Sequence, residues 1–277
     1  GPTPGGTPIP PAAPMPASPA PHPDDADRAF APFAARMAAA GVPAIAVRNF
    51  ARAYDALRSG GTGYVPGRDA RPPTDLTALA DLGRYADAGR AALDRTVVLK
   101  LNGGLGTSMG LRGPKSLLVV KDGLTFLDCI ARQVLHARAA QRARLPLVLM
   151  NSFATQGPTR AALARYPDRA ADVPLDFLQH QGPQVRADDL TPIDWPADPA
   201  LAWCPPGHGD LYPALSSSGV LDALLAAGYD YAFVSNADNL GATLDLALLG
   251  WLAAERVPFA LEVTARTPLD RKGGHLA

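Results

Sequence analysis

A glycine-rich segment that ends in a lysine contains the residues best suited to binding a phosphate. The run from Lys100 to Ser116 reads KLNGGLGTSMGLRGPKS and directly follows the apolar residues 97–99. Glycines after a strand let the backbone approach a ligand closely and present its N–H groups, an arrangement that suits phosphate oxygens. Lys115 adds a point charge for the same phosphates. The segment therefore predicts a phosphate-binding loop.

Three interpretations of this loop compete. In a Walker A loop a glycine directly precedes the lysine; here Pro114 separates Gly113 from Lys115, which excludes that motif. A dinucleotide-binding loop fits the glycine spacing better. Its acidic residue should end the second strand, however, whereas Asp122 lies in a turn before a predicted helix. That interpretation would make the protein a nicotinamide-dependent oxidoreductase. The third interpretation is a glycine turn without a ligand.

A histidine between two glycines marks the second candidate site, where residues 205–210 read PPGHGD. The prolines stiffen the chain that leads to it. Gly207 and Gly209 allow the imidazole of His208 to lie close to a ligand. The alternative is a histidine in a surface turn.

The third candidate site follows the apolar residues 231–235 and reads Asn236-Ala237-Asp238-Asn239. A carboxylate at the carboxyl end of a central strand can hold Mg²⁺ together with substrate phosphates, because Mg²⁺ often takes only one or two protein carboxylates. Asp238 is therefore a candidate metal ligand, and Asn236 could donate to sugar hydroxyls. The alternative is an Asx-type turn that ends the strand.

Five motifs in this order resemble those of the UTP–glucose-1-phosphate uridylyltransferases (UDP-glucose pyrophosphorylases) of the eukaryotic-like type. The resemblance extends from about Thr96 to the end of the chain. The motifs are residues 100–116, 149–153, 205–210 and 234–243, and a last one that joins 262–264 to 272–274. The related N-acetylhexosamine uridylyltransferases are less similar, because they typically carry an arginine where this chain has Ser108.

The resemblance implies how UTP, a sugar phosphate and Mg²⁺ are bound. UTP would contact Leu101, Asn102, Gly103, Gly104, Lys115, Gln179, Gly207 and Asp238. The sugar phosphate would contact Gly103, Gly104, His208, Asn236, Ala237 and Asp238. The catalytic residues would be Lys115 and Asp238; Asp238 would hold Mg²⁺, and Lys115 would act on the metal indirectly, through phosphate. The Gln179 amide would read the uracil edge. The segment Lys272, Gly273 and Gly274 would lie near the sugar pocket.

The resemblance also implies a reaction. An oxygen of glucose 1-phosphate would attack the α-phosphorus of UTP in line, giving UDP-glucose and pyrophosphate, with catalysis by positioning and charge neutralisation. That oxygen is already ionised, so His208 is not expected to act as a general base. Two alternatives stay open: an inactive fragment that only binds a uridine nucleotide, and a UTP-dependent transferase for another sugar 1-phosphate, such as galactose 1-phosphate. The family's second phosphate-binding lysine and its C-terminal β-helix domain are expected to lie beyond Ala277.

The elements that must position these residues alternate between strand and helix from Thr96 onward. Apolar runs predict strands at 97–101, 146–150, 175–179, 231–235 and 259–264, and helices at 124–143, 159–166, 219–227 and 244–255. This alternation predicts an α/β fold with a mixed, mostly parallel Rossmann-like sheet, which the resemblance assigns to the nucleotide-diphospho-sugar transferase (GT-A-like) type. Ligands then bind beyond the carboxyl ends of the strands.

Three regions are expected along the chain. Residues 1–23 contain ten prolines and predict a disordered arm. Residues 24–95 predict a helical N-terminal segment, and residues 96–277 the nucleotide-binding catalytic domain. Because the chain starts with Gly1 rather than Met, we expect it to be part of a longer protein.

Composition excludes several classes of function. The net charge of zero argues against nucleic acid or an anionic membrane as a partner. No apolar run approaches the roughly 20 residues of a membrane helix, and no secretory signal precedes the first helix. Cys129 and Cys204 cannot form a disulfide framework. A cytoplasmic location is expected, and the sequence does not indicate an oligomeric state.

Overall fold

The computed structural model describes residues 23–105, 113–166, 172–265 and 267–268. Most of the proline-rich arm and the middle of the glycine loop, including Ser108, lie outside the described residues. The same holds for the predicted sugar-pocket segment Lys272, Gly273 and Gly274.

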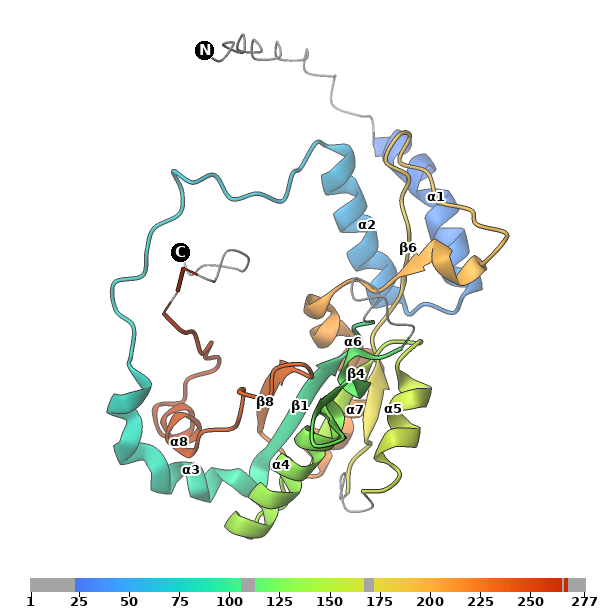
Figure 1. Cartoon of the computed structure of the whole chain (residues 1–277). Coiled ribbons are helices and arrows are strands. Elements are labelled where there is room, and N and C mark those ends of the chain that lie inside the picture. The colour runs from blue at the N-terminus through green and yellow to red at the C-terminus, as the bar shows by residue number, and fades with distance from the viewer. Residues whose placement is uncertain (1–22, 106–112, 167–171, 266, 269–277) are drawn as a thin grey trace, which may run out of the picture.

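A four-stranded parallel sheet forms the centre of the described structure (Figure 1). Its order is β5 (Asp176–Leu178), β4 (Leu147–Asn151), β1 (Thr96–Asn102) and β8 (Tyr231–Asn236). Successive residues of β1 enter two separate cores, since Val98 belongs to one and Val97 and Leu99 to the other. Burial on both faces is typical of a parallel sheet covered by helices. The predicted α/β fold with a parallel sheet is confirmed.

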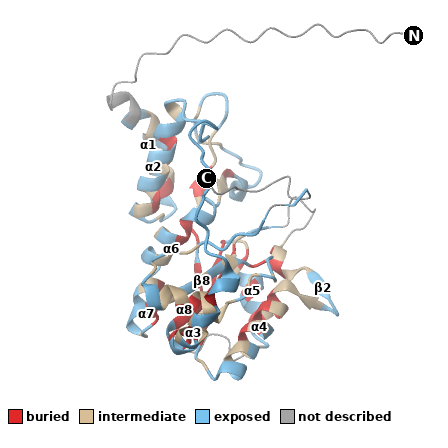
Figure 2. Ribbon diagram, turned by 90° about the vertical axis from the view of Figure 1, so that its left-hand side faces the viewer, coloured by how far each residue is buried: buried red, intermediate tan, exposed pale blue. Residues whose placement is uncertain are grey.

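Helices cover both faces of this sheet. On one face lie α4 (Phe126–Gln141) and α5 (Gln156–Leu163), which bury Ile130 and Leu163. On the other lie α6 (Leu211–Ser217) and α7 (Val220–Ala226), which bury Leu211 and Leu224. Figure 2 shows buried residues concentrated around the sheet and on the inner sides of these helices.

The N-terminal helices occupy two different places (Figure 1). α1 (Pro23–Ala39) and α2 (Ala44–Arg58) pack through aromatic rings, with the centroids of Phe33 and Tyr54 4.8 Å apart. They lie beside β6 (Gly182–Pro183), and Tyr54 Oη donates to Leu190 O at 3.0 Å. The elements η1 (Leu79–Tyr85), α3 (Ala86–Ala92) and η2 (Leu93–Arg95) instead lie near α8 (Leu246–Glu255) and the start of β1. The proposed division into three regions stays a prediction.

The helices α3 and α8 approach each other at two glycines. A Cβ on Gly89 would lie 1.8 Å from Leu246 O, and one on Gly250 would lie 1.9 Å from Tyr85 O. Glycine is needed at both positions because the backbones leave no room for a side chain. This contact helps to hold α8, whose Leu249 belongs to the core cluster against which Phe233 of β8 packs.

Several short elements were not predicted. They are η4 (Lys115–Leu117), β2 (Val119–Lys121), β3 (Leu124–Thr125), η6 (Pro199–Ala202), β6, β7 (Trp203–Cys204), η7 (His208–Asp210) and α6. The predicted helix 124–143 begins later, at Phe126, because Thr125 and Asp128 form a capping box and residues 124–125 pair with β2. Among the described helices, none combines the length and apolar character that crossing a membrane requires.

The predicted strand at 259–264 is wrong. These residues form no strand among the parts of the chain that are described. Phe259 and Leu261 are 64% and 63% exposed, so their apolar side chains are not covered by a sheet neighbour. A mostly apolar run expresses a preference for extended structure, but a strand also needs a hydrogen-bonded partner.

Candidate active site

The carboxyl ends of the parallel strands meet in register at one edge of the sheet. Asn102 of β1 pairs with Asn151 of β4, and Asn151 pairs with Leu178 of β5. On the other side of β1, Leu101 pairs with Asn236 of β8. The segments that leave these strands carry most of the predicted site residues, so the topology gathers them at this edge.

Lys115 and Asp238 form an ion pair across this edge, although 123 positions separate them in sequence. Lys115 Nζ lies 3.0 Å from Asp238 Oδ2. The loop returns to β1 because Leu105 forms a β-bridge with Pro114 and the Lys115 N–H donates to Gly104 O at 3.1 Å. The side chains of Lys115 and Asp238 are 38% and 36% exposed, which leaves the pair accessible to a ligand.

The turn that carries Asp238 is fixed to the end of β1. The Ala237 N–H donates to Leu101 O at 3.0 Å, and the Asn239 N–H donates to Asn236 O at 3.2 Å. Ala237 is buried in the core, so it could reach a sugar phosphate only through its backbone. Asn236 is exposed at the same edge.

Gly103 lies directly against Gln179, the residue predicted to bind the uracil edge. A Cβ at Gly103 would be 2.5 Å from Gln179 Nε2, so only glycine leaves the amide its present place. The Gln179 N–H donates to Asn151 O at 2.8 Å, which continues the pairing of β5 with β4 by one residue. The glycine loop and the end of β5 are thus in contact.

Asn102 uses its side chain inside the protein. Its Nδ2 donates to Asn151 Oδ1 at 2.7 Å and to Thr159 Oγ1 at 2.9 Å, and the residue is 3% exposed. Any contact of Asn102 with a nucleotide would therefore come from the backbone. Leu101 is half-buried and packs against the core on the other face of the sheet.

A buried polar network supports these strand ends, and the sequence did not reveal it. Asp176 accepts hydrogen bonds from Asn151 Nδ2 at 2.8 Å and from Arg160 Nη2 at 2.7 Å. Together with the Asn102–Asn151 bond, this links three neighbouring strands beneath the loop. The available signal was Asp176 itself, because a carboxylate within an apolar strand needs a partner.

Gly207 and His208 lie in the turn that precedes α6. Gly207 has a φ of +103°, a conformation that favours glycine, and His208 begins η7. His208 is exposed, as a group that meets a soluble ligand must be.

Lys100 is a buried amine that the sequence did not single out for a role. It is 2% exposed, and its Nζ donates to Ser235 Oγ at 2.5 Å and to Ala242 O at 3.0 Å. These partners lie on either side of Asp238 in the chain. Burial lowers the pKa of Lys100 from its ordinary 10.5 to about 8.

Asp238 is the predicted metal ligand at this edge. Among the described residues, no three histidine, cysteine or acidic side chains form a cluster that could hold a metal ion. A single carboxylate suits Mg²⁺ when phosphate oxygens and water complete its coordination. Asp238 fits that role chemically, because it is accessible and its only ion-pair partner among the described side chains is the exposed Lys115.

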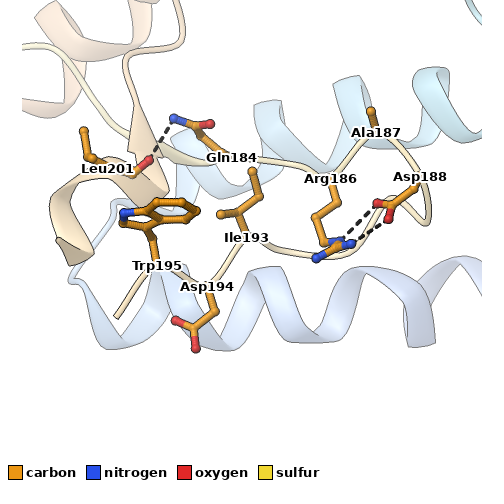
Figure 3. A pocket seen from close by; sticks show the side chains of 8 residues that line it. All are labelled: Gln184, Arg186, Ala187, Asp188, Ile193, Asp194, Trp195 and Leu201. Atoms are coloured by element: carbon orange, nitrogen blue, oxygen red, sulfur yellow. Dashed lines mark hydrogen bonds and ion pairs between the residues drawn. The ribbon is translucent and has the colours of Figure 1, made fainter. Parts of the chain in front are cut away.

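A cavity of about 450 Å³ lies away from these residues, next to the N-terminal helices (Figure 3). Trp195, Ile193 and Leu201 line one part of it, and Arg186 points to Asp188 in another. It contains no predicted site residue. The Arg186 guanidinium is already paired with two carboxylates, those of Asp188 and Asp189, so this cavity offers no free charge for a phosphate.

Comparison with known proteins identifies the family of the chain. The family model described as UTP–glucose-1-phosphate uridylyltransferase matches residues 50–277. The UTP–glucose-1-phosphate uridylyltransferase of Solanum tuberosum is 42% identical over 224 residues, covering 79% of this chain and 47% of that protein. A probable enzyme of the same name from Schizosaccharomyces pombe is 45% identical over 205 residues, covering 74% of this chain and 40% of its own length. The chain thus spans less than half the length of these two relatives.

Solved structures show the same fold. A UDP-glucose pyrophosphorylase from Leishmania major superposes with a TM-score of 0.83 at 43% identity, covering 90% of this chain and 52% of that one. A variant of the Leishmania major enzyme in complex with UDP-glucose gives 0.82 at 44% identity, covering 89% and 52%. With more than half of its length matched by the family model and this likeness in structure, the chain belongs to the UTP–glucose-1-phosphate uridylyltransferase family.

Proposed function

We propose that this chain carries the UTP-binding and catalytic edge of a uridylyltransferase that makes UDP-glucose and pyrophosphate from UTP and glucose 1-phosphate. The observation that carries the proposal is the Lys115–Asp238 pair, held at 3.0 Å beside a glycine loop at the carboxyl ends of parallel strands. Membership of the family supports this reading. A nicotinamide oxidoreductase is not supported, because Asp122 lies in the turn of the antiparallel β2–β3 pair and not at the end of a strand of the parallel sheet.

The residues divide the work between binding and charge neutralisation. The backbone of residues 101–104 holds the nucleotide, and the Gln179 amide pairs with the uracil edge. His208 contacts the phosphate of the sugar. An oxygen of that phosphate attacks the α-phosphorus of UTP and forms a new P–O bond, while the bond from the α-phosphorus to the bridging oxygen breaks and pyrophosphate leaves. Lys115 neutralises the charge that builds on the phosphate oxygens, so the step is accelerated mainly by positioning and electrostatics.

Asp238 is the residue that would hold Mg²⁺ with the substrate phosphates. When bound, the metal supplies further positive charge to the phosphate oxygens. Because Asp238 and Lys115 now neutralise each other, binding of a triphosphate must give each a new partner: the phosphates for Lys115 and the metal for Asp238.

The direct test is Lys115→Met, assayed for pyrophosphate release from UTP and glucose 1-phosphate with Mg²⁺. Removal of one charge that stabilises a phosphoryl transition state should lower kcat about 10²- to 10³-fold. Lys121→Met is the matched control, because Lys121 is an exposed lysine on β2. If the unchanged chain releases pyrophosphate and Lys115→Met releases it equally fast, the proposed role of Lys115 is wrong.

The second candidate function is the binding of a uridine nucleotide alone; the chain spans under half of two curated relatives, so turnover by this chain has to be measured directly. Calorimetric titration with UTP and Mg²⁺ beside the pyrophosphate assay separates the two, because heat without product supports binding alone. Replacing glucose 1-phosphate by galactose 1-phosphate in the same assay tests the choice of sugar.

A further inference from the structure

Two predicted site residues lie on segments that a buried histidine and aspartate join. Gln179 and His180 directly follow β5, whereas His208 belongs to η7, which ends at Asp210. His180 and Asp210 are 8% and 7% exposed, and neither is among the predicted ligand contacts. Buried polar groups of this kind need mutual partners, and these two residues provide them for each other.

The Asp210 carboxylate holds His180 with both of its oxygens. The His180 N–H donates to Asp210 Oδ2 at 2.6 Å, and His180 Nδ1 lies 2.8 Å from Asp210 Oδ1. Since a carboxylate is an acceptor, Nδ1 carries a proton in this contact. Nε2 then faces Ser217 Oγ at 2.9 Å, near the end of α6. One side chain thereby fixes both the backbone and the ring of His180.

The same aspartate also shapes the turn of His208. The Asp210 N–H donates to Gly207 O at 3.1 Å, which closes the turn around His208. On the other segment, the Gln179 N–H is bound to Asn151 O and its side chain touches Gly103. The end of β5 and the turn before α6 therefore cannot shift separately without breaking hydrogen bonds to the Asp210 carboxylate.

We propose that His180 and Asp210 are positioning residues that hold the uracil-reading Gln179 and the sugar-phosphate-binding His208 at a fixed separation. They touch neither substrate and act through the residues beside them. The hydrogen-bonded link between the two segments rests on the structure alone. Its expected consequence, selection of uracil over cytosine, rests on the proposed function. Charge-assisted hydrogen bonds, of which a buried carboxylate here accepts two, are the stronger kind.

Three variants separate positioning from general destabilisation. His180→Ala removes the ring that joins the two segments. His180→Asn can restore one N–H donor toward Asp210, since an asparagine amide can take the place of Nδ1–H. Ser217→Ala removes only the outer partner of the ring, so it should change the UTP-to-CTP affinity ratio by no more than about twofold. Loss of a hydrogen bond to a charged group instead changes an equilibrium by about tenfold or more.

The first measurement is independent of function. Hydrogen exchange followed by mass spectrometry should show faster exchange at residues 205–211 in His180→Ala. This segment contains Asp210, which lies 30 positions after the substituted residue. His180→Asn should exchange more nearly like the unchanged chain. Unaltered exchange at 205–211 in His180→Ala overturns the proposal. If that variant does not fold, the comparison is made between His180→Asn and Asp210→Asn.

The second measurement is the ratio of UTP to CTP affinity, by calorimetry with Mg²⁺. His180→Ala should lower that ratio about tenfold, and His180→Asn should recover most of it. A ratio that does not change in His180→Ala, with faster exchange at 205–211, removes the specificity role. An unchanged chain that fails to distinguish UTP from CTP instead contradicts the proposed function, while the exchange experiment still decides the mechanical link.

Discussion

Substitution of Gly103 by alanine should damage nucleotide recognition with little effect on stability. The new Cβ would lie 2.5 Å from Gln179 Nε2 and 2.8 Å from its Oε1, whereas ordinary contact begins near 3.4 Å. The amide must therefore retreat by about 1 Å. It can do so because it is the end of a flexible side chain, so the backbone of β1 and β5 stays in place.

The size of the effect follows from this displacement. A misplacement of about 1 Å in a positioning contact can lower the rate of an enzyme about 10²-fold. We expect the Kd for UTP to rise about 10- to 100-fold and the preference for UTP over CTP to fall in parallel. The free energy of unfolding should change by about 1 kcal/mol or less, because an alanine at an unstrained position loses little conformational entropy on folding.

The assay is calorimetry with UTP and with CTP, together with thermal unfolding of each variant. Gly113→Ala is the matched control: it lies in the same loop, and a Cβ there meets nothing within 4 Å. If Gly103→Ala binds UTP within about twofold of the unchanged chain and keeps its preference over CTP, the role given to Gln179 is refuted.

Three further predictions concern stability and pH. The pKa of Lys100 is lowered to about 8, so its charged form opposes folding below that pH and the opposition fades as pH rises toward 10.5. Lys100→Met removes this opposition, so at pH 7 the variant should have a higher free energy of unfolding than the unchanged chain. Measured by urea unfolding, that difference should shrink by on the order of 2 kcal/mol between pH 7 and 9.5. Gly250→Ala should destabilise by about 3 kcal/mol, because its Cβ would lie 1.9 Å from Tyr85 O; Gly83→Ala, with open space around it, should not. Burial opposes the charged form of Asp128, but hydrogen bonds from Thr125 and Tyr166 lower its pKa below 3.8. Its stabilising effect is present above that value and lost as pH falls through the lowered pKa, so Asp128→Asn should show a weaker loss of stability in acid titration.

The strands of the central sheet could be predicted because their sequence pattern is local. The residues 97–101, 146–150 and 231–235 are mostly apolar runs, and each corresponds to β1, β4 or β8 within a residue or so at either end. The segment 259–264 has a comparable pattern but forms no strand among the described residues. Pattern alone cannot tell these cases apart, because strand pairing depends on a neighbour that is distant in sequence.

The site divides in the same way. Asp238 could be proposed from its motif after a strand, and Gln179 from the family resemblance, because a parallel sheet brings its carboxyl ends together. The inward direction of the Asn102 side chain could not, since its partners Asn151 and Thr159 lie 49 and 57 positions away. The link between His180 and Asp210 is equally non-local, and a lone histidine after a strand carries no periodic signal.

The Lys115–Asp238 pair explains how such an edge can be charged and yet ready for a triphosphate. An ion pair with both side chains more than a third exposed stabilises a protein by about 1 kcal/mol or less. Breaking the ion pair therefore costs little of the free energy of nucleotide binding. Lys115 can instead donate to phosphate oxygens, and such charge-assisted hydrogen bonds are about twice as strong as neutral ones. Three buried charged groups near the strand ends behave differently, because Lys100, Asp176 and Asp210 are each fixed by at least two hydrogen bonds. Exchange of partners is thus confined to the exposed pair, while the strand ends that carry it stay in place.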